Sequence, residues 1–181
     1  MAVVNYIAAA ASLNYVDGYA TITDPTNYEG LTWVGTPIAK SLLETTYLEL
    51  KRGQKIGEVA AAMGAEVIAG FPSDALVAGV FHRYDSDLQG QIGVVGAVVY
   101  VRNVLDSSGT YIMSYVDAST GQRNYAAHNF AQLKELLTDL GEFSAEMLGR
   151  LQGQIGQLMS INTGNVNADL SAIAAIHWQH L

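Results

Sequence analysis

The chain has 181 residues, no cysteine and a formal net charge of −8. The absence of cysteine excludes disulfides, thiolate catalysis and cysteine-based zinc or iron–sulfur sites. The nine basic residues are scattered and only Lys51 and Arg52 are adjacent, so no cationic track exists for phosphate groups. We therefore expect binding neither to nucleic acid nor to an anionic membrane surface.

Hydrophobic residues make up 50% of the chain and charged residues only 14%. This balance predicts an ordered core and a surface rich in uncharged polar side chains, which is common in proteins that pack against other proteins. The N-terminus lacks a basic segment before its apolar residues, which argues against a secretory signal. The longest apolar stretch, residues 92–101, is too short to span a bilayer, so we expect no membrane-spanning helix.

The first 53 residues predict a hairpin followed by a helix. Residues 1–16 fit a helix, a strand or an arm that folds only on a neighbour. Residues 18–23 and 30–35 alternate like two strands on either side of a turn, and so predict a hairpin over residues 18–35. Thr36 and Pro37 are typical of a helix start, and Gly53 of its end.

The middle of the chain predicts mainly strands. Residues 55–63 indicate a helix and residues 65–70 a strand, which Pro72 would end before a short helical turn. Residues 92–105 are rich in β-branched side chains and are followed by a Gly-ended turn at 106–109 and by alternating residues 110–116. This pattern predicts a hairpin of two strands.

The composition changes near residue 125, and the remainder predicts three helices. These cover residues 126–140 with Gly141 as a stop, residues 142–161, and a last helix capped by Asn167. In the last helix we expect Leu170, Ile173, Ala174 and Ile176 to point inward. Apolar residues in the second helix follow the spacing of a coiled-coil seam, which predicts a subunit or inter-helix interface at Leu148, Leu151, Ile155 and Leu158.

The predicted fold class is therefore α+β: an antiparallel sheet with packed helices and a helical C-terminal third. The expected organisation is an α+β module over residues 1–120 and a helical region over residues 121–181, which also fits a single continuous domain.

Two weak metal candidates stand out. The segment from Asp85 through Asp87 to Gly90 matches the front of a calcium loop, but Gly96 occupies the twelfth position where that loop needs a bidentate Glu. A solvated turn is the favoured interpretation. His177 and His180 would share a helix face, without a recognisable third ligand.

No pattern predicts a catalytic or cofactor-binding residue. The motifs GxSxG, GxGxxG and GxxxxGK are absent, so we expect a protein that is not an enzyme and needs no cofactor. The alternative is a metal- or small-ligand-dependent enzyme, with His82, Asp85 and Asp87 as its best candidates. A binding module that uses Trp33, Trp178 and some of the ten tyrosines is another alternative.

The segments AVVYVRNVLDSSGTYIMSYV and LGRLQGQIGQLMSINTGN, with few Lys and many Gly, Ala, Asn, Thr and Tyr residues, resemble bacteriophage virion proteins of the tail, neck, baseplate or capsid-accessory kind. This resemblance implies a structural, self-associating protein whose partners are itself or other structural proteins. It implies location in a virion; without a phage origin we expect a cytoplasmic protein.

Overall fold

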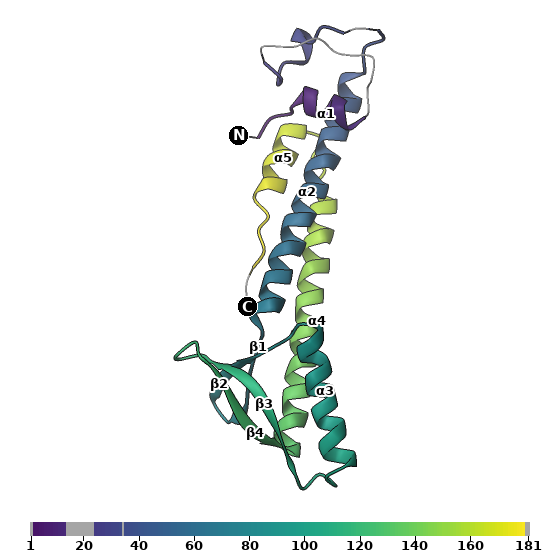
Figure 1. Cartoon of the computed structure of the whole chain (residues 1–181). Coiled ribbons are helices and arrows are strands. Elements are labelled where there is room, and N and C mark those ends of the chain that lie inside the picture. The colour runs from purple at the N-terminus through teal and green to yellow at the C-terminus, as the bar shows by residue number, and fades with distance from the viewer. Residues whose placement is uncertain (1, 14–23, 34, 180–181) are drawn as a thin grey trace. The chain divides into compact units, whose positions relative to one another are not determined.

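The computed structural model describes residues 2–13, 24–33 and 35–179. Within these residues the fold is α+β, as predicted, with helices packed against one four-stranded antiparallel sheet (Figure 1). The elements are α1 (Tyr6–Ser12), the 3-10 helix η1 (Tyr28–Gly30), α2 (Lys40–Ala69), β1 (Phe71–Val77), β2 (Val80–Tyr84), α3 (Leu88–Asn103), β3 (Thr110–Asp117), β4 (Arg123–Asn129), α4 (Phe130–Ser160) and α5 (Val166–Ala174).

The chain divides into two compact units. Unit 1 comprises the described residues up to 61 together with residues 152–179, and unit 2 comprises residues 62–151. The boundary predicted near residue 120 falls within unit 2, between β3 and β4.

Unit 1 is a helical assembly in which α1 and α5 pack on parts of α2 and α4. Leu43 of α2 and Leu158 of α4 are fully buried in its core, together with Ala9 of α1 and Ile173 of α5. Asn165 caps α5 by accepting a hydrogen bond from the amide of Ala168, two positions before the predicted cap. The predicted inward positions of α5 are confirmed for Leu170 and Ile173, whereas Ala174 is exposed.

Three predictions for the segment that forms α2 are wrong. The helix begins at Lys40 instead of Pro37, continues through Gly53, and occupies residues 65–69, where a strand was predicted. An isolated glycine costs a helix about 1 kcal/mol relative to alanine, which burial of Leu43 and Val59 offsets. The helix ends at Ala69, and the next residue, Gly70, has a φ of +92°, in the left-handed region that follows many helix ends.

The sheet of unit 2 has the order β1–β2–β3–β4 with every pair antiparallel. The prediction that Pro72 ends a strand before a short helical turn is wrong, because Pro72 lies within β1. An edge strand tolerates proline, because the backbone amides on its outer side have no neighbouring strand to bond to. The predicted strand at 110–116 is confirmed as β3, but it pairs with β4 and not with residues 92–105. Residues 126–129 therefore belong to a strand and not to the predicted helix.

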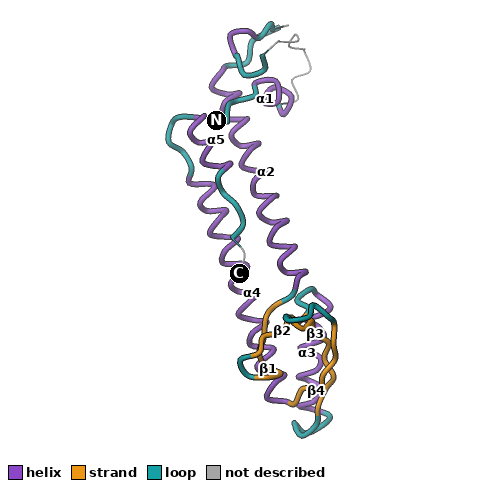
Figure 2. The backbone as a smooth tube through the Cα atoms, turned by 90° about the vertical axis from the view of Figure 1, so that its left-hand side faces the viewer, coloured by secondary structure: helices purple, strands orange, loops and turns teal. Residues whose placement is uncertain are grey.

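The predicted strand at residues 92–105 is wrong, because this segment forms α3. Short apolar runs do not distinguish a strand from a buried helix by composition alone. Asp87 favours a helix at the start of this segment, because its carboxylate accepts a hydrogen bond from the backbone amide of Gly90 and caps the helix. Figures 1 and 2 show α3 beside α4, where Ala97 and Val101 pack against Leu133.

Helix α4 is continuous from Phe130 to Ser160, so the predicted stop at Gly141 is also wrong. The second strand of the hairpin predicted at 18–35 is contradicted as well: residues 28–30 form η1, and Trp33 makes only an isolated bridge. The first strand, at residues 18–23, lies outside the described residues.

Candidate functional site

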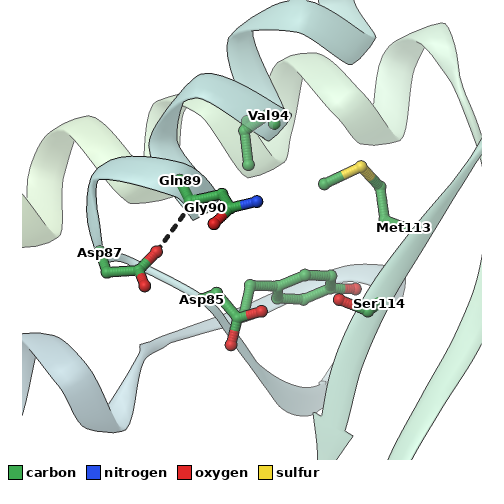
Figure 3. A pocket seen from close by; sticks show the side chains of 9 residues that line it. Asp85, Asp87, Gln89, Gly90, Val94, Met113 and Ser114 are labelled. Atoms are coloured by element: carbon green, nitrogen blue, oxygen red, sulfur yellow. Dashed lines mark hydrogen bonds between the residues drawn. The ribbon is translucent and has the colours of Figure 1, made fainter.

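A pocket of about 290 Å³ lies between the start of α3 and strand β3 in unit 2. Figure 3 shows Asp85 and Asp87 on one side and Met113 and Ser114 on the other. β2 pairs with β3 at His82 and Arg83, and the residues that follow, Tyr84, Asp85 and Asp87, line the pocket.

Both carboxylates at this pocket already have partners. Asp85 accepts two hydrogen bonds from the guanidinium of Arg123, at 2.7 and 2.8 Å, and these bonds hold the pKa of Asp85 below its usual range. Asp87 caps α3 through a 2.8 Å bond from the amide of Gly90. A Cβ at Gly90 would lie 2.2 Å from the carbonyl oxygen of Asp85, so the tight turn itself requires this glycine. Both carboxylates of this turn are thus committed to contacts within the chain, and the turn leads into helix α3.

Among the described residues, no group of three or more His, Asp or Glu side chains is arranged to hold a metal ion. His177 follows α5, and its backbone carbonyl accepts a 2.9 Å hydrogen bond from the side-chain amide of Gln154. Its proposed partner His180 lies outside the described residues, so this pair remains a prediction.

A second polar cluster lies on the buried face of the sheet. The phenol oxygen of Tyr84 is 2.8 Å from Nε2 of His128, whose Nδ1 is 3.1 Å from the carbonyl oxygen of Ala126. A carbonyl only accepts, so Nδ1 carries the proton and the Tyr84 hydroxyl donates to Nε2. His82 lies nearby, with its Nδ1 4.0 Å from a carboxylate oxygen of Asp117.

Burial perturbs the titration of this cluster. It lowers the pKa of His128, and the neighbouring His82 adds to that effect, whereas the hydrogen bond to Ala126 opposes it. Burial also raises the pKa of Tyr84, with smaller contributions from Tyr115 and Asp139. Both groups therefore stay neutral near pH 7.

This geometry supports packing more than catalysis. A general base has to come within hydrogen-bond reach of a substrate proton, but His128 has no exposed surface and Tyr84 almost none. The Nε2 lone pair of His128 is already occupied by the Tyr84 hydroxyl. The cluster satisfies buried polar groups inside the sheet, and it does not bring His82, Asp85 and Asp87 together at one centre.

The most unusual surface of unit 2 belongs to α3. Val94, Ala97 and Val101 are buried, while the opposite side exposes four aliphatic residues. We call these four the α3 stripe: Leu88, Ile92, Val95 and Val99. Their spacing is 4, 3 and 4 residues, which places them on one line along the helix. Over residues 92–101 the helix is thus apolar around its circumference, a property of helices that are covered on all sides.

The exposed face of the sheet also carries large apolar side chains. Ile112 and Tyr125 point to the same side as Ser114, and Phe81 of β2 lies on that side as well. All three large residues are exposed, Ile112 by 67% and Tyr125 by 70%. We call Phe81, Ile112 and Tyr125 the outer sheet face.

The predicted interface on α4 divides into buried and exposed positions. Leu158 is fully buried in the core of unit 1, where it contacts other helices of the same chain. Leu148 is exposed, and Leu151 and Ile155 are half-buried. A subunit contact at these three residues stays a prediction. Sequence reasoning missed the α3 stripe, although its 4-3-4 spacing was legible once residues 88–103 were taken as a helix.

In comparisons with known proteins, no family model, curated protein or solved structure matches the chain. Over the described residues, no helix combines the length and the hydrophobicity needed to cross a membrane.

Proposed function

We propose that this chain is a structural assembly protein that associates with copies of itself inside a larger particle such as a bacteriophage virion. The observation that carries the proposal is α3, a helix with one apolar side packed on its own chain and an equally apolar opposite side exposed. Covering an aliphatic side chain completely stabilises a complex by about 1.5–3 kcal/mol. The stripe therefore provides a driving force for association.

Two further properties support this reading. The outer sheet face adds a second exposed apolar surface in the same unit. The low charge content leaves wide regions of the surface without the ionic groups that keep monomers apart. The composition and the Gly- and Gln-spaced helix that resemble virion proteins point in the same direction.

The alternative of a metal- or ligand-dependent enzyme has less support. Its best residues are committed to internal contacts: Asp85 to Arg123, and Asp87 to the start of α3. The buried pair of Tyr84 and His128 is shielded from any substrate. No observation on the described residues favours this function over assembly.

The mass of the full chain in solution tests the proposal. Light scattering on the eluting peak of a size-exclusion column should give a multiple of the 19.3 kDa chain mass, increasing in population with concentration. A mass of 19.3 kDa at every concentration up to the millimolar range would overturn self-association.

A further inference from the structure

The α3 stripe has the pattern of a helix–helix seam. Its four residues repeat at 4-3-4 spacing, the spacing by which apolar side chains of one helix interlock with those of another. Leu88 is 73% exposed and Ile92 63%, so neither is satisfied by contacts within the chain. On the opposite side, Ala97 and Val101 fill the contact with α4, and Val94 is buried as well.

Gly96 lies in the interior of α3 beside the stripe. A Cβ at this position would meet nothing within 4 Å, as is also true of Gly93 in the same helix. The absence of a side chain at Gly96 therefore leaves room for a second helix to approach α3 closely, and no contact within the chain blocks that approach.

The charges favour a second copy of this chain as the occupant. Copies carrying a net charge of −8 repel one another through most surfaces, but α3 contains a single charged residue, Arg102. Arg102 lies near the C-terminal end of α3 and the acidic cap Asp87 at the N-terminal end. In an antiparallel pair each Arg102 comes toward the partner's Asp87, whereas a parallel pair brings like charges together.

We infer that the α3 stripe is a two-fold seam on which α3 of a second copy lies antiparallel. This inference rests on the self-association proposed above and assigns its surface. The axis passes near Val95 and Gly96, at the middle of the helix. Ile92 then packs near the partner's Val99, and the partner's Val95 lies over Gly96. Such a contact uses the same patch on both copies.

Two matched substitutions test the surface. Ile92→Glu places a carboxylate within the seam, and Ile112→Glu makes the same change on the outer sheet face at nearly equal exposure. Ile92→Glu should convert the dimer to 19.3 kDa monomers and weaken association at least about tenfold, while Ile112→Glu should leave the dimer intact. Circular dichroism checks that both variants keep the helix content of the parent.

The outcomes separate the two proposals. A parent chain that is monomeric at every concentration defeats the proposed function itself. A dimeric parent that stays dimeric with Ile92→Glu leaves self-association standing and overturns the α3 seam. Loss of the dimer with Ile112→Glu alone overturns the seam as well and moves the contact to the sheet.

Cross-linking tests the same seam without depending on a charged substitution. Because the chain has no cysteine, a single introduced cysteine is the only thiol that a short bis-maleimide can link. Val95→Cys should give a cross-linked dimer in high yield. Leu88→Cys alone should not, but a mixture of Leu88→Cys and Asn103→Cys chains should. Failure of Val95→Cys overturns the seam, and efficient linking of Leu88→Cys alone overturns the antiparallel orientation.

Discussion

The hydroxyl of Tyr84 donates to Nε2 of His128 across 2.8 Å, between two strands that are not neighbours in the sheet. Both residues are almost completely buried, so this bond lies where water does not compete. It ties β2 to β4 on the face that packs toward α4, where Phe71 also contacts Phe143.

Removing the Tyr84 hydroxyl should therefore destabilise the fold. In Tyr84→Phe the ring still packs, but Nε2 of His128 loses its donor and remains buried. We expect a loss of about 1–3 kcal/mol in the free energy of unfolding, measured by urea denaturation. Tyr125→Phe, which removes a hydroxyl from the exposed face, should cost much less. Equal losses in the two variants would contradict the role of this bond.

The lowered pKa of His128 predicts an acid-dependent stability. The folded state keeps this side chain neutral below its ordinary pKa of 6.5, while the unfolded chain takes up a proton there. The contribution of His128 to the free energy of unfolding should be constant above pH 7. The free energy of unfolding should then decrease as the pH falls below 6.5. The slope from one proton is at most about 1.4 kcal/mol per pH unit.

A variant isolates this contribution. In His128→Asn the side chain no longer titrates, so the loss of stability between pH 6.5 and 5 should become shallower than in the parent. The carboxylates with lowered pKa values, such as Asp85 and Asp117, lose their contribution only at lower pH and do not interfere in this window. An unchanged slope would assign the pH dependence to other groups.

Adding a single methyl group at Gly70 should greatly lower the stability of the fold. Its φ is +92°, and an added Cβ would lie 2.5 Å from the carbonyl oxygen of Tyr84. Gly70→Ala should therefore lower the free energy of unfolding by about 2–4 kcal/mol in a denaturation experiment. Gly121→Ala is the matched control: it also has a positive φ, +67°, but its Cβ meets nothing within 4 Å. It should cost only about 1 kcal/mol.

The turn at Asp85 and Asp87 should not respond to calcium. Each carboxylate already accepts hydrogen bonds from the chain, so calcium would have to displace Arg123 or uncap α3. We expect the melting temperature to stay the same after addition of calcium or of a chelator. Asp85→Asn should lower stability by less than about 1 kcal/mol, because its ion pair with Arg123 is largely exposed. A rise in melting temperature with calcium would contradict this prediction and support a calcium site at Asp85 and Asp87.

Local patterns in the sequence predicted part of this fold. The alternation of residues 110–116 identified β3, and the apolar spacing of α5 identified its buried side. α5 has one clearly apolar side, which is the condition under which periodicity is informative. α3 fails this condition, since both of its faces are apolar, and residues 92–105 were consequently assigned to a strand.

The candidate site was less accessible to sequence reasoning. Asp85 and Asp87 were singled out as possible ligands because of their spacing, but spacing does not show that Arg123, 38 residues away, occupies one of them. Tyr84 and His128 are 44 residues apart and meet only through the register of the sheet. Contacts of this kind depend on tertiary packing, which no local pattern encodes.

The junction at Gly70 has a mechanical consequence. α2 ends at Ala69 and β1 begins at Phe71, so one residue separates helix from strand. That residue is anchored on both sides: its amide bonds to Val67, and its carbonyl accepts from Arg83. No flexible loop lies between α2 and β1. A pulling force along α2 would therefore act directly on the first hydrogen bonds between β1 and β2. Pulling on the helix should thus unzip the sheet from its edge.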